Sequence, residues 1–235
     1  GLHVLHIQTI TEMLLRQLVQ KENNRYALSK EQIRMITTAS ALHDIGKISI
    51  PDEILNKPGR LTAEEFAVIK GHSMAGANML SELPLDQKEE PLVKTAYEIC
   101  RWHHERYDGG GYPDGLKGEE IPVSAQVVAL ADVYDALTSE RCYKDAYSHE
   151  KAIEMILAGQ CGAFNPLMLE CLLDISSSLK KKMGYKSKER YEQTDLSDIA
   201  SRFHDFEMDS SEKIVQQLEF ERMRYNFLAE GNRNI

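Results

Sequence analysis

Apolar residues recur at helical spacing along almost the whole chain, and runs of alternating β-branched residues are scarce. Apolar positions three or four residues apart line one face of a helix, whereas a strand needs a period of two. The pattern therefore predicts an all-α fold. The first predicted helix covers residues 2–20, with Leu5, Leu14, Leu15 and Leu18 as apolar positions. No capping residue precedes it, so we expect the sequence to begin inside a helix.

Two capping boxes predict where further helices begin. Ser29 and Gln32 have the spacing at which each side chain can bond a free backbone N–H of the other residue, and Thr62 and Glu65 repeat this spacing. A helix is expected to follow each pair.

Two prolines predict two more helix starts, because proline favours the first turn of a helix. These helices are expected to run from Pro91 to about His104 and from Pro122 to about Leu137. Residues 108–115 lie between them and are rich in glycine, so they are expected to form a loop.

Composition narrows the classes of function. The 235 residues carry a formal net charge of −9, which argues against binding DNA or RNA polymers, because such binding needs a basic face. No apolar run approaches the roughly 18 residues that span a bilayer, so we expect no membrane insertion and a cytoplasmic location. The four cysteines, Cys100, Cys142, Cys161 and Cys171, lack a CxxC spacing and are expected to be buried reduced thiols.

Histidines and aspartates occur in a pattern that suits transition metals, which bind mixed sets of imidazole nitrogens and carboxylate oxygens. They fall one group per predicted helix: His3, then His43 with Asp44, His72, His103 with His104, and Asp132. Adjacent helical residues diverge by about 100°, which favours at least two metal centres over one tetrahedral ion. A single buried histidine is more often a hydrogen-bonded core residue, but a set of this size reverses that expectation.

Other histidines and one further aspartate do not belong to this set. His6, His149 and His204 are expected to be ordinary core or surface residues. Asp135 stands one helical turn after Asp132, and we expect it to lie on the helix surface or to orient a ligand imidazole rather than to bind metal itself.

Several motifs in order resemble one enzyme family. Residues 43–47, HDIGK, resemble the H-D-x-x-K core of the HD phosphohydrolase superfamily. Residues 103–113, HHERYDGGGYP, are similar to the HHExxDGxGYP signature of its HD-GYP subfamily. Residues 121–122, 131–139 and 141–144 resemble later blocks, so the resemblance covers His3 to about Leu173.

The resemblance implies an HD-domain helical bundle that hydrolyses a cyclic dinucleotide with the help of metal ions. Cyclic di-GMP is the leading substrate, with pGpG, GMP or both as products, and cyclic GMP-AMP is the alternative. The implied cofactors are two or three divalent transition-metal ions, iron or manganese. Two other functions stay open: another HD-superfamily nucleotide phosphohydrolase, or a signalling module that binds cyclic dinucleotides without hydrolysis.

The resemblance also implies roles for single residues. The metal ligands would be His3, His43, Asp44, His72, His103, His104 and Asp132. Asp44 would bridge two ions, and Lys47 would meet the scissile phosphate unless it is only a solvated helix-end lysine. Arg141 and Lys144 would bind substrate phosphate oxygens. Tyr112 would offer its ring to a purine, unless the glycine-rich loop is a plain turn.

The sequence departs from the family pattern in two places. Members with three metals carry a Glu four residues before the first-helix His, a position that would precede Gly1, so two and three metals both stay open. Asn165-Pro166 stands where many relatives have Asp-Pro, and we expect this change to affect a turn more than catalysis.

The last part of the sequence begins with a polar stretch, unlike the part before it. We assign residues 1–178 to the HD-GYP domain and residues 179–235 to a polar linker and C-terminal helix. The predicted helix follows a capping box at residues 209–212 and has an apolar stripe through Ile214, Leu218, Tyr225 and Leu228. We expect this helix to join further signalling domains, and the alternative is a helix folded back on its own domain.

Overall fold

The computed structural model describes residues 2–139 and 146–184. Helices and loops make up this part of the chain, and no strand occurs in it, so the all-α prediction is confirmed. The α-helices are α1 (Leu2–Leu18), α2 (Lys30–Ala39), α3 (Asp52–Leu55), α4 (Ala63–Lys70), α5 (His72–Ser81), α6 (Leu85–Lys88), α7 (Pro91–Trp102), α8 (Val123–Thr138), α9 (His149–Leu157) and α10 (Pro166–Lys182). The 3₁₀ helices are η1 (Ser40–Leu42), η2 (Ile45–Ser49) and η3 (Gly118–Glu120).

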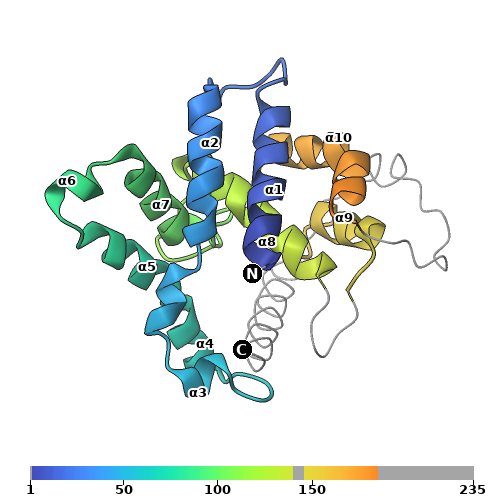
Figure 1. The fold of residues 1–235 in the computed structure, drawn as a ribbon. Coiled ribbons are helices and arrows are strands. Elements are labelled where there is room, and N and C mark those ends of the chain that lie inside the picture. The colour runs from blue at the N-terminus through green and yellow to red at the C-terminus, as the bar shows by residue number, and fades with distance from the viewer. Residues whose placement is uncertain (1, 140–145, 185–235) are drawn as a thin grey trace.

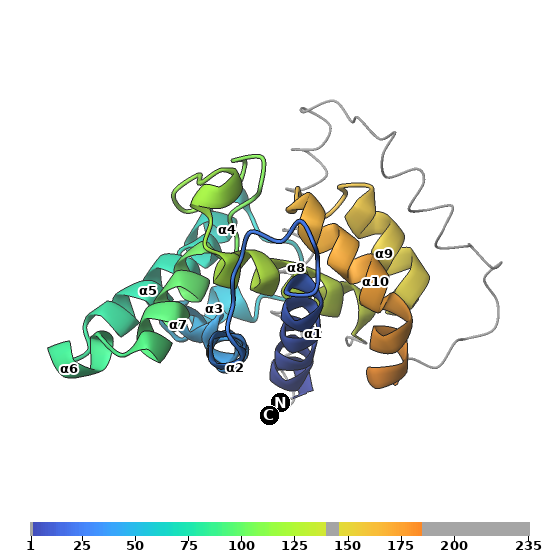
Figure 2. The same ribbon diagram turned by 90° about the horizontal axis from the view of Figure 1, so that it is seen from above.

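Helix α8 runs through the middle of the fold. In Figures 1 and 2 it lies between α5, α6 and α7 on one side and α9 and α10 on the other, and α1 crosses it. Every residue from Ser124 to Asp135 is buried, as expected for a helix that is covered on all sides. Its polar side chains, including Asp132 and Asp135, therefore face the interior and need partners there.

Helix α1 packs against α2, α8 and α10 through one apolar face. Leu14, Leu15 and Leu18 are buried, as the sequence predicts, together with Ile7 and Ile10. Leu5, the other apolar position named for this helix, is 59% exposed and lies off this face. The stripe that packs inward runs through residues 7, 10, 14 and 18, which repeat at the three- and four-residue spacing of a helix face.

Both predicted capping boxes are confirmed. At the start of α2 the Ser29 hydroxyl accepts a hydrogen bond from the Gln32 backbone N–H at 3.1 Å, and the Ser29 N–H donates to the Gln32 side chain at 2.8 Å. Thr62 and Glu65 make the same reciprocal pair at the start of α4. Each pair satisfies two backbone donors that a helix leaves free at its N-terminus.

The two prolines differ in position. Pro91 is the first residue of α7, as predicted, whereas Pro122 is the capping residue one position before α8 rather than a first-turn residue. Helix α7 ends at Trp102, so that His103 is its C-terminal cap. The predicted loop at residues 108–115 is confirmed, since no helix covers this segment.

Asn165 starts α10 and also joins a buried polar group. Its side-chain oxygen accepts a hydrogen bond from the backbone N–H of Leu167 at 3.0 Å, which caps the helix. Its amide nitrogen donates to Gln126 Oε1 and to Tyr26 Oη, each at 2.9 Å. The role of Asn165 thus extends from the turn that the sequence predicts to contacts between α8 and α10.

Three of the four cysteines are described, and Cys100, Cys161 and Cys171 are buried thiols, as predicted. Cys142 and His204 lie outside the described residues. Of the predicted linker and C-terminal helix at residues 179–235, only residues 179–184 are described, and the first of these belong to α10. Among the described helices, none has the length and apolar content needed to cross a membrane.

Gly46 lets η2 approach α5 with no side chain between them. A Cβ atom on Gly46 would lie 1.9 Å from the backbone oxygen of His72 and 2.4 Å from the backbone nitrogen of Gly76. Both atoms belong to a helix backbone that cannot move independently. The glycine that follows Ile45 is therefore required by the close packing of the two segments that bear Asp44 and His72.

We expect Gly46→Ala to lower the free energy of unfolding by at least about 2 kcal/mol, because the added methyl group overlaps backbone atoms. Urea denaturation followed by circular dichroism measures the change. Ala67→Ser, which adds one atom to an exposed position of α4, serves as the control and should leave stability nearly unchanged. Equal stability of Gly46→Ala and the control would contradict the packing argument.

His149 is a core residue, as the sequence predicts. It is 3% exposed and lies between the Tyr134 hydroxyl, 2.6 Å from Nδ1, and the Ser176 hydroxyl, 2.7 Å from Nε2. Burial lowers the pKa of His149 below its ordinary value, because the charged ring would lose its hydration. The unfolded chain therefore takes up this proton at a higher pH than the folded chain.

This difference predicts that His149 favours folding fully above its unfolded pKa, about 6.5, and that the contribution is lost as the pH falls below that value. The slope from one proton is at most about 1.4 kcal/mol per pH unit. Urea denaturation of the wild type and of His149→Gln between pH 7.5 and 5 measures it, and the wild type should lose more stability than the variant. Parallel pH profiles would refute this assignment.

Candidate metal centre

All but one of the predicted ligands lie where helices begin or end, and Asp132 lies within α8. His43 caps η1, and Asp44 is the residue before η2. His72 is the first residue of α5, because the helix breaks at Gly71, and it does not lie within a continuous third helix as predicted. His103 caps α7, and His104 follows it. Helix termini thus bring side chains that are distant in sequence to one buried region.

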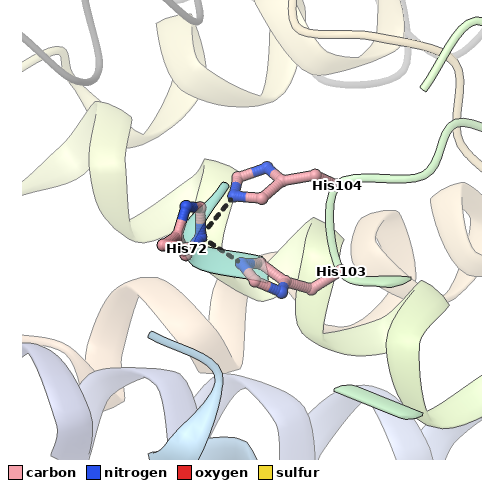
Figure 3. A group of neighbouring side chains, drawn as sticks. All are labelled: His72, His103 and His104. Atoms are coloured by element: carbon pink, nitrogen blue, oxygen red, sulfur yellow. Dashed lines mark hydrogen bonds between the residues drawn. The ribbon is translucent and has the colours of Figure 1, made fainter. Parts of the chain in front are cut away.

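His72, His103 and His104 form one compact group (Figure 3). The Nε2 atom of His72 lies 3.4 Å from Nε2 of His103 and 3.2 Å from Nε2 of His104. All three residues are buried, with exposures of 0%, 2% and 5%. Figure 3 shows the ring of His72 pointing toward those of His103 and His104, which follow each other on a second segment.

The protons of two of these rings are fixed by the backbone. Nδ1 of His72 lies 2.7 Å from the carbonyl oxygen of Ile69, and Nδ1 of His103 lies 2.8 Å from that of Ile99. A carbonyl oxygen can only accept, so each Nδ1 carries the proton, and in the neutral ring Nε2 presents a lone pair. Two such lone pairs at 3.4 Å repel each other, whereas a cation between them would bind both.

His3, His43 and Asp44 form the second group, in which the potential ligand atoms all lie within 4.8 Å of one another. Nδ1 of His43 donates to the backbone oxygen of Ser40 at 2.9 Å, which again leaves Nε2 as the inward atom. Within the described part of the chain, Nε2 of His3, Nε2 of His43 and Oδ1 of Asp44 are buried and make no hydrogen bond. Buried atoms of this kind need a partner, and a metal ion fits all three.

The Asp44 carboxylate lies between the two groups. Its Oδ2 is 3.3 Å from Nε2 of His43, and its Oδ1 is 3.3 Å from Nε2 of His72 and 3.9 Å from Nε2 of His103. One carboxylate oxygen thus faces each group. This geometry is suited to a bridging ligand, the role that the resemblance implies for Asp44.

Lys47 contacts the same carboxylate at Oδ2, the oxygen that also faces His43. Its ammonium group donates a hydrogen bond to Asp44 Oδ2 at 2.6 Å. Burial by itself would raise the pKa of Asp44, but the positive charge of Lys47 and the neighbouring His43 hold this pKa well below its usual range. Asp44 is therefore ionised at neutral pH and available to a cation.

Asp135 holds the His3 ring in place. Its fully buried carboxylate accepts hydrogen bonds from Nδ1 of His3 at 2.6 Å and from Nδ1 of His6 at 2.7 Å, and Ser139 donates to Oδ1 at 2.7 Å. Burial would raise the pKa of Asp135, but the hydrogen bond from His3 contributes most to lowering it. Asp135 therefore orients a predicted ligand imidazole. His6, expected to be an ordinary core or surface residue, shares this carboxylate.

Asp132 lies one turn away on α8 and is 3% exposed. It belongs to neither of the two compact groups that the described residues form. Its assignment as a ligand stays a prediction.

Comparison with known proteins identifies the family. The HD domain family model matches residues 4–164, more than half of the chain.

The chain belongs to the HD domain family.

Several curated relatives agree with this assignment. A probable cyclic di-GMP phosphodiesterase from Vibrio cholerae is 42% identical over 179 residues, which are 74% of this chain and 40% of that protein. A cyclic di-GMP phosphodiesterase response regulator from Xanthomonas campestris pv. campestris is 43% identical, with 67% of this chain and 40% of that protein covered. A 3'3'-cGAMP-specific phosphodiesterase 2 from Vibrio cholerae is 38% identical, with 74% and 31% covered. The HD-GYP resemblance is confirmed, and the chain spans less than half the length of these relatives.

The glycine-rich loop of this HD domain is held by Glu105, a residue to which the sequence analysis gave no role. Glu105 Oε1 accepts hydrogen bonds from the backbone N–H groups of Asp114 at 2.7 Å and Gly115 at 3.0 Å. A Cβ atom on Gly111 would lie 2.4 Å from the backbone nitrogen of Arg106, so the loop folds tightly against the segment after α7. The position of Glu105 directly after the histidine pair was the available signal.

Tyr112 lies beside the first group of the HD domain. Its ring stacks on that of His104, with centroids 4.8 Å apart and planes inclined by 17°. The peptide bond between Tyr112 and Pro113 is cis. Stacking of a nucleobase on Tyr112 stays a prediction, and Arg141 and Lys144, the other two predicted substrate contacts, lie outside the described residues.

We expect Asp44→Ala and His103→Ala each to remove most bound metal, since Asp44 contacts both groups and His103 belongs to one. Metal content is measured by inductively coupled plasma mass spectrometry on purified protein, with circular dichroism as a check of folding. His149→Gln, which changes a histidine outside both groups, is the matched control and should retain metal. Full metal occupancy in either Asp44→Ala or His103→Ala would contradict the ligand assignment.

Proposed function

We propose that this HD domain is the catalytic part of a metal-dependent phosphodiesterase that hydrolyses a cyclic dinucleotide, with cyclic di-GMP as the leading substrate. The observation that carries the proposal is the Asp44 carboxylate between two groups of imidazoles whose Nε2 atoms converge. Paired metal sites of this kind suit hydrolysis of phosphodiesters.

His72, His103 and His104 would hold one ion, and His3 and His43 the other, with Asp44 shared and Asp132 as a further ligand. Nitrogen and carboxylate ligands together suit iron or manganese, and we propose two ions, with a third open. When bound, such ions lower the pKa of coordinated water and offset negative charge on the non-bridging phosphate oxygens.

The residues of the chain have separate tasks in the proposed reaction. Asp135 and the carbonyl oxygens of Ser40, Ile69 and Ile99 fix the rings so that the ligand atoms need no rearrangement. Lys47 would offset charge on the scissile phosphate as it builds up, from its place beside Asp44.

The remaining substrate contacts rest on the sequence. Arg141 and Lys144 would bind phosphate oxygens of the substrate, and Tyr112 would contact a purine. The products would be pGpG, GMP or both.

The names of the relatives support the substrate class. Two of the relatives described above are named for cyclic di-GMP and one for 3'3'-cGAMP. Cyclic GMP-AMP is therefore the second candidate substrate. The greater length of these relatives supports the further proposal that this domain is joined to other signalling domains in a cytoplasmic protein.

Two rival functions predict different results. Another HD-superfamily nucleotide phosphohydrolase would cleave linear nucleotides faster than cyclic dinucleotides. A module that only binds cyclic dinucleotides would retain metal and substrate without turnover. The convergence of six predicted ligands in two groups favours an enzyme over this module.

The decisive experiment combines metal analysis with a product assay on cyclic di-GMP, cyclic GMP-AMP and linear pGpG. Protein loaded with iron or manganese should release linear product from a cyclic dinucleotide, and chelation of the metal should abolish turnover. Lys47→Met, with its metal retained, should lower kcat by about tenfold or more, because one charge that meets the scissile phosphate is lost. Metal-loaded protein that leaves both cyclic dinucleotides intact would refute the proposal.

A further inference from the structure

Lys70, the last residue of α4, lies beside the candidate metal centre and takes no part in the function proposed above. Its ammonium nitrogen is 5.2 Å from the ring centroid of Phe66, one turn earlier on the same helix, and 5.3 Å from that of Tyr112. Cations are attracted to the faces of aromatic rings, so the two rings hold this flexible side chain in one region. Phe66 itself is 5% exposed and fixed in the small core between α3 and α4.

The charge of Lys70 has no carboxylate partner within the described part of the chain. Other cations around the site have one. Lys47 is paired with Asp44 at 2.6 Å, Arg101 with Asp114 at 2.7 Å and Arg106 with Asp108 at 2.6 Å. Lys70 is therefore a localised positive charge that an anion can approach without displacing an acidic side chain.

A short chain of contacts links Lys70 to the metal centre. Tyr112, which Lys70 contacts, stacks on His104, and Nε2 of His104 is 3.2 Å from Nε2 of His72. Lys70 also precedes His72 by two residues. The ammonium group thus lies at the rim of the centre, one ring beyond a proposed ligand, rather than among the ligand atoms.

We propose that Lys70, held by Phe66 and Tyr112, binds the second, non-reacting phosphodiester of a cyclic dinucleotide while the first is at the metal centre. The inference rests on the proposed function. A cyclic dinucleotide carries two phosphodiester groups in one ring, so a site that hydrolyses one must accommodate the charge of the other. An unpaired cation next to the reaction centre offsets this negative charge. It would also distinguish a cyclic dinucleotide from a substrate with a single phosphodiester.

A phosphate fits this position better than a nucleobase edge. A lysine ammonium group acts as a compact point charge, which suits phosphate oxygens and gives little selectivity among bases. The domain as a whole is acidic, with a formal net charge of −9 for the chain, so an anionic substrate needs local positive charge. Because Lys70 also contacts Tyr112, which stacks on His104, a test must separate recognition of the second phosphate from support of the metal centre.

The experiment compares two substrates on metal-loaded protein. Cyclic di-GMP has two phosphodiester groups, and bis(p-nitrophenyl) phosphate has only one. Lys70→Met should raise KM for cyclic di-GMP by about tenfold, the value of one charge-assisted hydrogen bond, with kcat and metal content nearly unchanged. The kcat/KM for bis(p-nitrophenyl) phosphate should stay within about twofold of the wild type, because that substrate has nothing to place at Lys70.

Two further variants complete the design. Lys70→Arg keeps the positive charge and should recover most of the affinity for cyclic di-GMP. Lys30→Met removes an exposed lysine at the start of α2, at the opposite end of that helix from His43, and controls for the loss of one charge from the protein. Its KM should match that of the wild type.

The remaining outcomes contradict either the inference about Lys70 or the proposed function. An unchanged KM for cyclic di-GMP in Lys70→Met would refute the inference while leaving the proposed function intact. Equal losses on both substrates, or loss of metal, would show that Lys70 supports the centre through Tyr112 and does not recognise the second phosphate. No hydrolysis of cyclic dinucleotides by metal-loaded wild type would instead refute the proposed function, on which the inference rests.

Discussion

The carboxylate of Asp44 and the imidazoles around it place several electron-rich atoms in one small, largely buried space. The Nδ1 protons of His43, His72 and His103 are engaged by backbone carbonyls, so the Nε2 lone pairs point inward with no proton between them. Atoms arranged in this way repel one another in a medium of low permittivity unless positive charge is present. Lys47 supplies such charge at one edge of Asp44, and the space between the rings suits cations.

The helix ends of the fold create this arrangement. In the last turns of α4 and α7, the carbonyl oxygens of Ile69 and Ile99 accept the ring protons of His72 and His103. The Ile99 carbonyl also accepts the backbone N–H of His103 at 3.0 Å. The same atoms thus complete α4 and α7 and orient two imidazoles. Gly46 brings η2 close enough to α5 for Asp44 to contact His72. The geometry of the centre follows from how these helices end and from how closely they pack.

Local chemistry explains what the sequence could predict. The capping boxes at Ser29 and Thr62 depend on contacts within four residues, and both occur as expected. The six predicted ligands that form the two groups follow from residue type and motif. The sharing of Asp135 by His3 and His6 depends on how α1 crosses α8, which no local pattern specifies, and the exposure of Leu5 has the same origin. Glu105 was missed because its partners are backbone groups of a folded loop.

The contact between His3 and Asp135 joins residues 132 positions apart. The other predicted ligands, among them His43, His72 and His103, also lie far apart in the sequence. The ligand set therefore exists only when helices from most of the described chain are in place. Little affinity for metal is then expected in the unfolded chain, and binding free energy is added to the stability of the native state by mass action. With the proposed ions, metal supply would thus set the folded fraction of the domain as well as its chemistry, so a metal-starved population would be more open to proteolysis before any substrate is present.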